Sequence, residues 1–145
     1  MPQKILYTAE ATSDGEGRNG HVATSDGLLD LDLAIQRELG GQGGKTNPEQ
    51  LFAAGYAACF HNSLLVVARR AKADVTGSTV TAEVGIGPED VGYGLAVTLE
   101  IALPNVEPAQ AEQLIEAAHQ VCPYSRATRG NITVDLRQLP AQARS

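Results

Sequence analysis

The chain has 145 residues, of which 43% are hydrophobic, and it carries a formal net charge of −6 at pH 7. This length fits a single domain over residues 1–145, and the composition is too apolar for a disordered chain. The acidic charge argues against a nucleic acid partner, and no basic run suggests binding to an anionic membrane. We find no signal peptide and no long uncharged apolar span, so a cytoplasmic location is expected.

The first third of the chain predicts short strands separated by turns. Residues 5–12 are apolar-leaning and predict a strand, and the glycine-rich residues 14–20 predict a turn. Residues 21–25 and 28–33 predict two strands, and the Asp26-Gly27 pair between them is a hairpin signal. A glycine-rich loop follows at 40–44.

The longest regular element is a helix expected from Pro48 to about Lys72. Asn47 is a good N-cap, Pro48 suits the first helical position, and Gln50 completes a capping box. Residues 51–68 are apolar on nearly all sides, which indicates a buried helix. One side is lined by small residues, so another backbone can approach it closely: Ala54, Gly55, Ala57 and Ala58.

Two alternating runs, residues 79–86 and 95–103, predict an antiparallel strand pair. Pro108 opens a second helix with apolar residues at helical spacing, and Pro123 is expected to end that helix. Residues 132–136 predict a last strand.

Residues 139–145 predict a frayed tail, and the sequence contains no repeat or linker. The element order is strands, helix, strands, helix and strand. That order favours an α+β fold over a doubly wound sheet.

Three sequence patterns resemble binding motifs for a dinucleotide, a nucleotide phosphate or zinc, but none has the neighbouring residues or elements that such a site requires. Residues 15–20 match G-x-G-x-x-G but precede a strand, and residues 43–46 resemble a P-loop whose first glycine position holds Leu39. His119 and Cys122 share a helix face, but no C-x-x-C or H-x-x-x-H spacing supports a zinc site. We therefore expect no metal and no bound cofactor.

The two cysteines, Cys59 and Cys122, are the strongest chemical signal in the chain. A buried inert thiol remains an alternative, because free cysteine packs as a small hydrophobic residue. Against this, both cysteines lie on or at the end of a helix, and Pro123 is expected to expose the Cys122 thiol to a loop. Cys122 lies at a helix C-terminus, where the dipole disfavours a thiolate, which suits a resolving rather than an attacking cysteine.

An attacking thiolate at Cys59 needs a nearby cation. Cys59 is about twelve residues into its helix, too far from the N-terminus for the dipole to act on it. Glu49, in the first turn, is a plausible anchor for an arginine, although it is also simply a favourable first-turn residue. Spacing leaves five candidates: Arg18, Arg69, Arg70, Arg126 and Arg129.

Two long motifs carry a family resemblance. Asn47–Phe60 (NPEQLFAAGYAACF) and Cys122–Asn131 (CPYSRATRGN) closely resemble the cysteine motifs of the organic hydroperoxide resistance proteins, within the wider OsmC-like superfamily. The lead-in Gly40–Thr46 and the loop carrying Arg18 are similar too, so the resemblance covers nearly the whole chain.

The resemblance implies a thiol peroxidase acting on organic and fatty-acid hydroperoxides. It implies that Cys59 is peroxidatic, that Cys122 is resolving through a Cys59–Cys122 disulfide, and that Arg18 and Glu49 form the activating pair. It also implies antiparallel sheets around long buried helices, an intertwined homodimer, and recycling by dihydrolipoyl-type dithiols.

Two other functions remain open: an OsmC-type peroxidase of broader preference, and a non-catalytic redox sensor or binder using the same thiols. Leu51, Phe52 and Phe60 suggest an apolar pocket and therefore a preference for alkyl hydroperoxides. Glu49 and Cys59 lie about 15 Å apart along one helix. We therefore expect either a site shared between two chains or an Arg18 that folds over its own helix.

Overall fold

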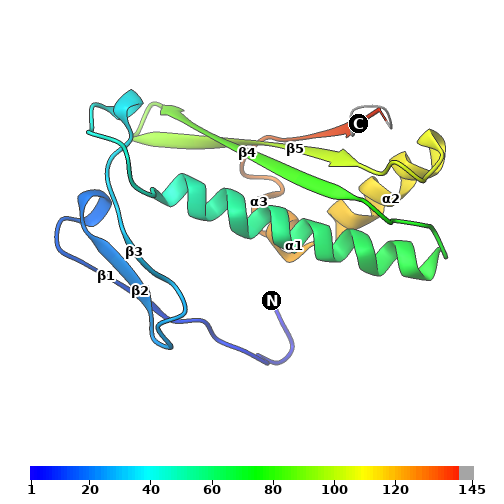
Figure 1. Cartoon of the computed structure of the whole chain (residues 1–145), viewed down its shortest axis with the longest axis horizontal. Coiled ribbons are helices and arrows are strands. Elements are labelled where there is room, and N and C mark those ends of the chain that lie inside the picture. The colour runs from blue at the N-terminus through cyan, green and yellow to red at the C-terminus, as the bar shows by residue number, and fades with distance from the viewer. Residues whose placement is uncertain (141–145) are drawn as a thin grey trace. The chain divides into compact units, whose positions relative to one another are not determined.

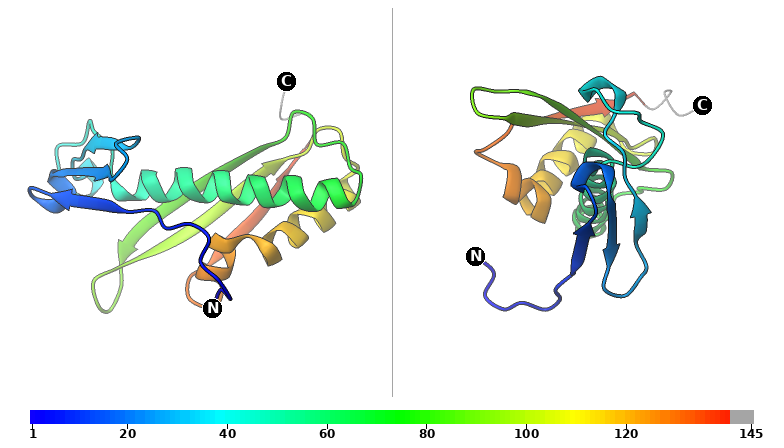
Figure 2. Two further views of the ribbon diagram at one scale, coloured as in Figure 1. Left: turned by 90° about the horizontal axis from the view of Figure 1, so that it is seen from below. Right: turned by 90° about the vertical axis from the view of Figure 1, so that its left-hand side faces the viewer.

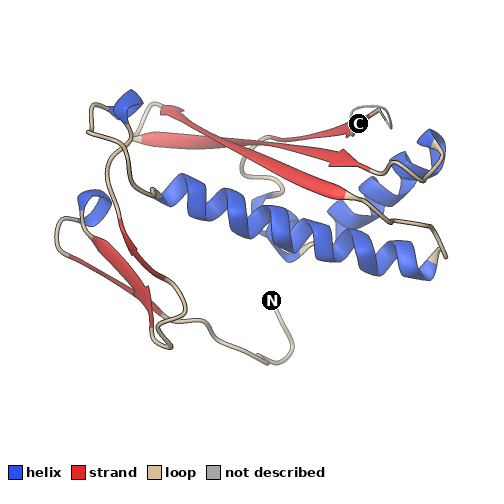
Figure 3. Ribbon diagram, viewed as in Figure 1, coloured by secondary structure: helices blue, strands red, loops and turns tan. Residues whose placement is uncertain are grey.

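The computed structural model describes residues 1–140, so residues 141–145 of the predicted tail lie outside it. The chain divides into two compact units, Met1–Leu51 and Phe52–Ser145, and each is described by itself. Each contains a three-stranded sheet (Figure 3). The α+β class is confirmed, whereas the assignment of 1–145 to a single domain stays a prediction.

The first unit is built around an antiparallel sheet in the order β1-β2-β3 (Figure 1). Its elements are β1 (Ala11–Asp14), η1 (Gly17–Asn19), β2 (His21–Thr24), β3 (Asp30–Asp32) and η2 (Arg37–Leu39). The strands bury little: no residue of β1 is buried, and the buried hydrophobic residues before the long helix are Leu33 and Ala34.

The predicted hairpin is confirmed, and its turn is fixed by side chains. The Asp26 carboxylate accepts hydrogen bonds from the Thr24 hydroxyl and the Leu28 N–H, while Gly27 adopts a φ of 76°. The strand predicted at 5–12 is largely wrong, because β1 begins at Ala11. The reason is that β2 ends at Thr24 as the chain enters this turn, which leaves residues 5–9 without a neighbouring strand.

Helix α1 (Pro48–Arg70) confirms the long predicted helix. The Asn47 side chain caps it by accepting a hydrogen bond of 2.9 Å from the Gln50 N–H. Within the chain one side of α1 stays exposed, along Ala54, Ala58 and Asn62.

The expectation that the chain has no long uncharged apolar span is wrong. Residues 51–68 contain no Asp, Glu, Lys or Arg. By length and composition alone, α1 is the one helix within residues 1–140 that could cross a membrane, with a mean hydropathy of 1.5. The core helix of a soluble protein has the same properties, and the packing described next accounts for the apolar face of α1.

The second unit holds a sheet in the order β4-β5-β6. Strands β4 (Thr79–Pro88) and β5 (Tyr93–Ala102) pair antiparallel, as predicted. Strand β6 (Val134–Leu139) runs parallel to β5, so the expectation of purely antiparallel sheets needs correction. The helical crossover between β5 and β6 brings the chain back alongside Val97, midway along β5, and such a crossover permits a parallel pair.

Helices α1 and α2 (Pro108–Val121) cover one face of this second sheet, as Figure 2 shows from below. A short helix, α3 (Pro123–Thr128), follows directly, where the sequence predicted a loop. Tyr56 and Phe60 of α1 are fully buried. They belong to a core that joins the two helices to the inner face of β5, with further members Leu64, Val67, Ala68, Val97, Leu99, Ile101, Leu114, Ile115, Ala118 and Cys122.

Candidate active site

The two cysteine sulphurs are in contact. The Sγ of Cys122 donates a hydrogen bond of 3.6 Å to the Sγ of Cys59, and both thiols are free. Cys59 is partly buried on α1, whereas Cys122 is completely buried. The expectation that Pro123 exposes the Cys122 thiol is therefore wrong.

Local chain geometry explains the buried position of Cys122. Pro123 cannot continue α2, but proline suits the first position of a new helix. Cys122 is consequently extended, with φ −63° and ψ 124°, and forms both the end of α2 and the N-cap of α3. Its N–H donates to the Ala118 carbonyl and its carbonyl accepts from the Arg126 N–H, so both helices fix this residue.

The surroundings of Cys59 oppose its ionisation. Burial raises the pKa of the Cys59 thiol, and the neighbouring Cys122 thiol raises that pKa further. A hydrogen bond from the Tyr124 N–H acts in the opposite direction and lowers the pKa of Cys59. A thiolate at Cys59 therefore calls for additional positive charge.

Three aromatic rings gather beside the cysteines. The ring centroids of Phe52 and Tyr124 are 6.2 Å apart in an edge-on arrangement, and those of Tyr56 and Tyr124 are 5.6 Å apart. The Tyr124 ring also lies against Gly55 of α1. These contacts hold the first turn of α3 against α1.

A buried hydrogen-bond network, which the sequence did not predict, surrounds the Cys122 segment. The Tyr56 hydroxyl lies 2.7 Å from the Ser125 hydroxyl, which in turn lies 2.8 Å from Nδ1 of His119. Thr128 closes the cluster at 3.3 Å from the Tyr56 hydroxyl. Burial lowers the pKa of His119, and the nearby Arg129 lowers it further, which favours a neutral imidazole in the network.

Arg18 and Glu49 form a bidentate ion pair in the first unit. Two guanidinium nitrogens of Arg18 donate to the two carboxylate oxygens of Glu49, at 2.8 and 3.1 Å. The Gln36 amide donates to the same carboxylate at 2.8 Å, a contact that sequence reasoning missed. The hydrogen bonds from Arg18 lower the pKa of Glu49, and those to Glu49 raise the pKa of Arg18, so both groups are charged.

The other candidate arginines are engaged differently. The guanidinium of Arg129 donates to the His119 carbonyl, in the last turn of α2. This cation satisfies a free carbonyl at the negative end of the α2 dipole. The remaining candidates are exposed: Arg69, Arg70 and Arg126.

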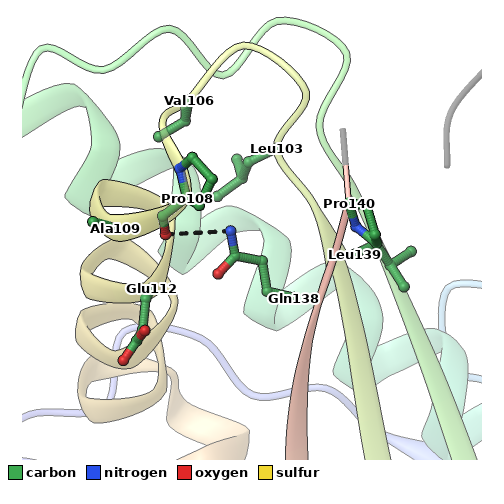
Figure 4. A pocket seen from close by; sticks show the side chains of 8 residues that line it. All are labelled: Leu103, Val106, Pro108, Ala109, Glu112, Gln138, Leu139 and Pro140. Atoms are coloured by element: carbon green, nitrogen blue, oxygen red, sulfur yellow. Dashed lines mark hydrogen bonds between the residues drawn. The ribbon is translucent and has the colours of Figure 1, made fainter. Parts of the chain in front are cut away.

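Two cavities of the second unit bear on substrate binding. One, of about 340 Å³, lies between α2 and the end of β6, where Gln138 donates to the Pro108 carbonyl (Figure 4). Neither cysteine lines this cavity or the one described next. The other, of about 410 Å³, includes Phe52 of the aromatic cluster and is lined by Phe52, Glu89, Tyr93, Gly94, Leu95, Ala127, Thr128, Asn131 and Ile132.

Metal ligation finds no support in the part of the chain that the structure describes. Residues 1–140 contain no group of three His, Cys, Asp or Glu side chains placed to hold an ion. Residues 43–46, which resemble a P-loop, form part of the loop that leads into α1.

Comparison with known proteins decides the family. The family profile "OsmC-like protein" matches residues 41–137. The organic hydroperoxide resistance protein of Xanthomonas axonopodis pv. citri is 53% identical over 137 residues, covering 93% of this chain and 96% of that protein. The chain belongs to the OsmC-like family.

Solved structures of OsmC-like proteins have the same fold. An organic hydroperoxide resistance protein from Legionella pneumophila is 51% identical, with a TM-score of 0.89 over 93% of this chain and 98% of that one. The Bacillus subtilis protein OhrB, also named for organic hydroperoxide resistance, is 40% identical with a TM-score of 0.83, over 93% and 100% of the two chains. The segment matched to the OsmC-like profile includes Glu49, Cys59 and Cys122, whereas Arg18 precedes it.

Proposed function

We propose that this OsmC-like protein is a thiol peroxidase that reduces organic hydroperoxides to alcohols. The observation that carries the proposal is the 3.6 Å contact between Cys59 and Cys122. Support comes from relatives at 53% identity that are named for organic hydroperoxide resistance. The contact pairs a partly buried thiol that a substrate can reach with a buried thiol that can only react inside the protein.

In the first step the Cys59 thiolate attacks one peroxide oxygen of the substrate. The sulphur–oxygen bond forms as the oxygen–oxygen bond breaks, and the departing alkoxide takes a proton to become the alcohol. Cys59 is left as a sulfenic acid. The sulphur of Cys122 then attacks the Cys59 sulphur, the sulphur–oxygen bond breaks, and hydroxide leaves with the Cys122 proton as water.

A dithiol returns the protein to its reduced state. One thiolate of the dithiol attacks the Cys59–Cys122 disulfide, and its second thiol displaces the protein through a second exchange. We propose a dihydrolipoyl-type reductant, as the family resemblance implies. A cycle that needs both thiols reduced fits a reducing compartment such as the cytoplasm.

We assign Arg18 and Glu49 to activation of the Cys59 thiolate. Burial raises the pKa of Cys59, so a permanent cation is needed to favour its charged form. An arginine stays charged, and its fork of donors can hold both a thiolate and the developing alkoxide. The two hydrogen bonds to Glu49, itself held by Gln36, orient the Arg18 guanidinium for this role.

We further propose that the working form is a homodimer with a shared site. The first unit buries few apolar side chains of its own, and α1 exposes the small side chains of Ala54 and Ala58. Glu49 and Cys59 are ten positions apart on α1, about 15 Å along its axis. An antiparallel pairing of α1 with its copy would bring Glu49 of one chain near Cys59 of the other.

The apolar side of the site suggests alkyl substrates. Phe52 belongs both to the aromatic cluster with Tyr124 and to the cavity of about 410 Å³. Each methylene of an alkyl tail buried there contributes about 0.8 kcal/mol. Phe60, which the sequence also assigned to this pocket, is completely buried in the core, so it offers no surface to a substrate.

Steady-state kinetics test this function. The consumption of cumene hydroperoxide and of hydrogen peroxide is measured with excess dihydrolipoamide and, separately, with a monothiol. We expect a higher kcat/KM for the alkyl hydroperoxide and faster turnover with the dithiol. Equal efficiency with both peroxides would favour an OsmC-type peroxidase of broad preference, and a reaction that stops after one equivalent would favour a redox sensor.

A further inference from the structure

Gly55 occupies a position where glycine is unfavourable. It lies inside α1 among alanines, and glycine in a helix interior costs about 1 kcal/mol relative to alanine. Its local contacts supply a reason. A Cβ at residue 55 would lie 2.8 Å from the hydroxyl oxygen of Tyr124 and 3.2 Å from the Cε2 ring carbon. Any larger side chain would therefore displace the Tyr124 ring.

Tyr124 reaches α1 at two points that are one helical turn apart. Its backbone N–H donates to the sulphur of Cys59, and its hydroxyl end lies on Gly55. Gly55 and Cys59 are four positions apart, so they share a helix face and are separated by about 6 Å along the axis. The tyrosine thus lies along the helix and covers this turn.

The neighbouring aromatic rings limit where the Tyr124 ring can go. Phe52 contacts it edge-on and Tyr56 packs at 5.6 Å between centroids. Tyr56 is completely buried, and Ser125 holds its hydroxyl at 2.7 Å. The Tyr124 side chain is half-exposed, so a side chain at residue 55 would turn its ring toward solvent and remove the contacts with Phe52 and Tyr56 that hold the start of α3 against α1.

We propose that Gly55 and Tyr124 are a pair of positioning residues for Cys59: the missing side chain at Gly55 lets the Tyr124 ring lie on α1, and the seated ring holds the Tyr124 N–H on the Cys59 sulphur. The role of this hydrogen bond in catalysis rests on the proposed peroxidase function. Its effect on the ionisation of the Cys59 thiol is independent of that function. A hydrogen bond to a charged sulphur is about twice as strong as one to a neutral group, so it favours the thiolate.

Thiol titration tests the pair without any hydroperoxide. In a Cys122→Ser background, where Cys59 is the single thiol, the rate of alkylation by iodoacetamide is measured against pH. Gly55→Ala and Tyr124→Ala are the test variants. Gly85→Ala is the matched control, because a Cβ at residue 85 meets nothing nearer than 3.8 Å. Tyr124→Phe keeps the ring and removes the hydroxyl.

We expect Gly55→Ala and Tyr124→Ala to move the midpoint of the alkylation profile to higher pH. At neutral pH both should react about tenfold more slowly, the change expected for loss of one hydrogen bond to a charged group. Gly85→Ala and Tyr124→Phe should match the parent. Gly55→Ala combined with Tyr124→Phe should recover part of the loss, because the closest clashing atom is gone.

An unchanged midpoint in both test variants, with helical circular dichroism retained, would overturn the inference. If Gly55→Ala does not fold, Tyr124→Ala decides alone. Loss of rate without a change in midpoint would also overturn it, because that pattern reflects access to the thiol rather than its ionisation. Since no hydroperoxide is used, failure of the peroxidase proposal would appear in turnover assays and leave this result standing.

Discussion

The sulphur atoms of Cys59 and Cys122 lie 3.6 Å apart although 63 positions separate the two residues in sequence. A disulfide requires about 2.05 Å between the sulphurs, so the two atoms need to approach by a small distance only. Cys122 is held on both sides, by the end of α2 and the start of α3. The two cysteines can therefore form a disulfide in the resolving step without a change in the secondary structure around Cys122.

The two cysteines should have separable roles. Cys59→Ser should abolish hydroperoxide reduction, because the attacking sulphur is lost. Cys122→Ser should react once and stop at a Cys59 sulfenic acid, which mass spectrometry detects as an added oxygen or as a dimedone adduct. Wild-type protein should instead lose two hydrogens as the disulfide forms. Full activity in Cys59→Ser would remove the basis for this assignment.

Glu49 should make the stability of the protein depend on pH in acid. Hydrogen bonds from Arg18 lower the pKa of Glu49 in the folded state below its ordinary value of 4.5. The carboxylate therefore stabilises the fold above pH 4.5, and this contribution is lost as the pH falls through the lowered pKa. Because Arg18 is partly exposed, we expect about 1 kcal/mol at most.

Urea denaturation of Glu49→Gln against wild type measures this contribution. The difference in free energy of unfolding should be present at neutral pH and should close in acid. Glu38→Gln, at an exposed position in η2, is the control and should show no such dependence. A difference that persists unchanged in acid would show that Glu49 stabilises the protein by other means than its charge.

The buried hydroxyl of Tyr56 should stabilise the Cys122 segment. Tyr56→Phe removes the hydroxyl that lies 2.7 Å from Ser125 and 3.3 Å from Thr128. We expect a loss of about 1–3 kcal/mol in the free energy of unfolding, since buried polar groups lose a partner. Tyr124→Phe removes a hydroxyl from a half-exposed side chain, so it should change the free energy of unfolding by less than about 0.5 kcal/mol. Equal effects in urea denaturation would argue against the network.

A mixing experiment separates a shared site from one built within a single chain. Cys59→Ser and Arg18→Ala are each expected to be inactive, and they are refolded together and alone. In a shared site, one site of the mixed dimer combines Cys59 of one chain with Arg18 of the other, so activity should partly return. A mixture that stays as inactive as its components would refute the shared site.

Local signals in the sequence were enough for the main elements. The Asn47 cap and Pro48 placed the start of α1 correctly, and the alternation over residues 79–86 and 95–103 gave the antiparallel pair β4 and β5. The helix cap and the alternation within each strand depend on neighbours within a few residues, which a sequence pattern records directly.

Features that depend on distant contacts were missed or misinterpreted. Pro123 ends α2 as predicted, but it also opens α3, and the contacts that hold α3 against α1 are not visible in the sequence. The parallel pairing of β6 follows from the path of the crossover, which has no local signature. The link from His119 through Ser125 to Tyr56 joins residues up to 69 positions apart.

In the candidate site, too, some features had a local sequence signal and others depended on the folded structure. Helix position alone marked both cysteines as unusual, yet five arginines were equivalent by spacing. The family resemblance singled out Arg18, and the structure places its guanidinium on the Glu49 carboxylate. The raised pKa of the Cys59 thiol depends on its burial, which no sequence pattern records.

The most direct test of the account is the number of turnovers that wild-type protein completes with excess cumene hydroperoxide and excess dihydrolipoamide. If Cys59 attacks and Cys122 resolves, consumption of hydroperoxide should continue for many equivalents per chain, and Cys59→Ser should show none above background. Consumption that ends at one equivalent per chain while dithiol is still present would contradict a peroxidase. Such a result would leave the contact between Cys59 and Cys122 as a sensor of oxidation.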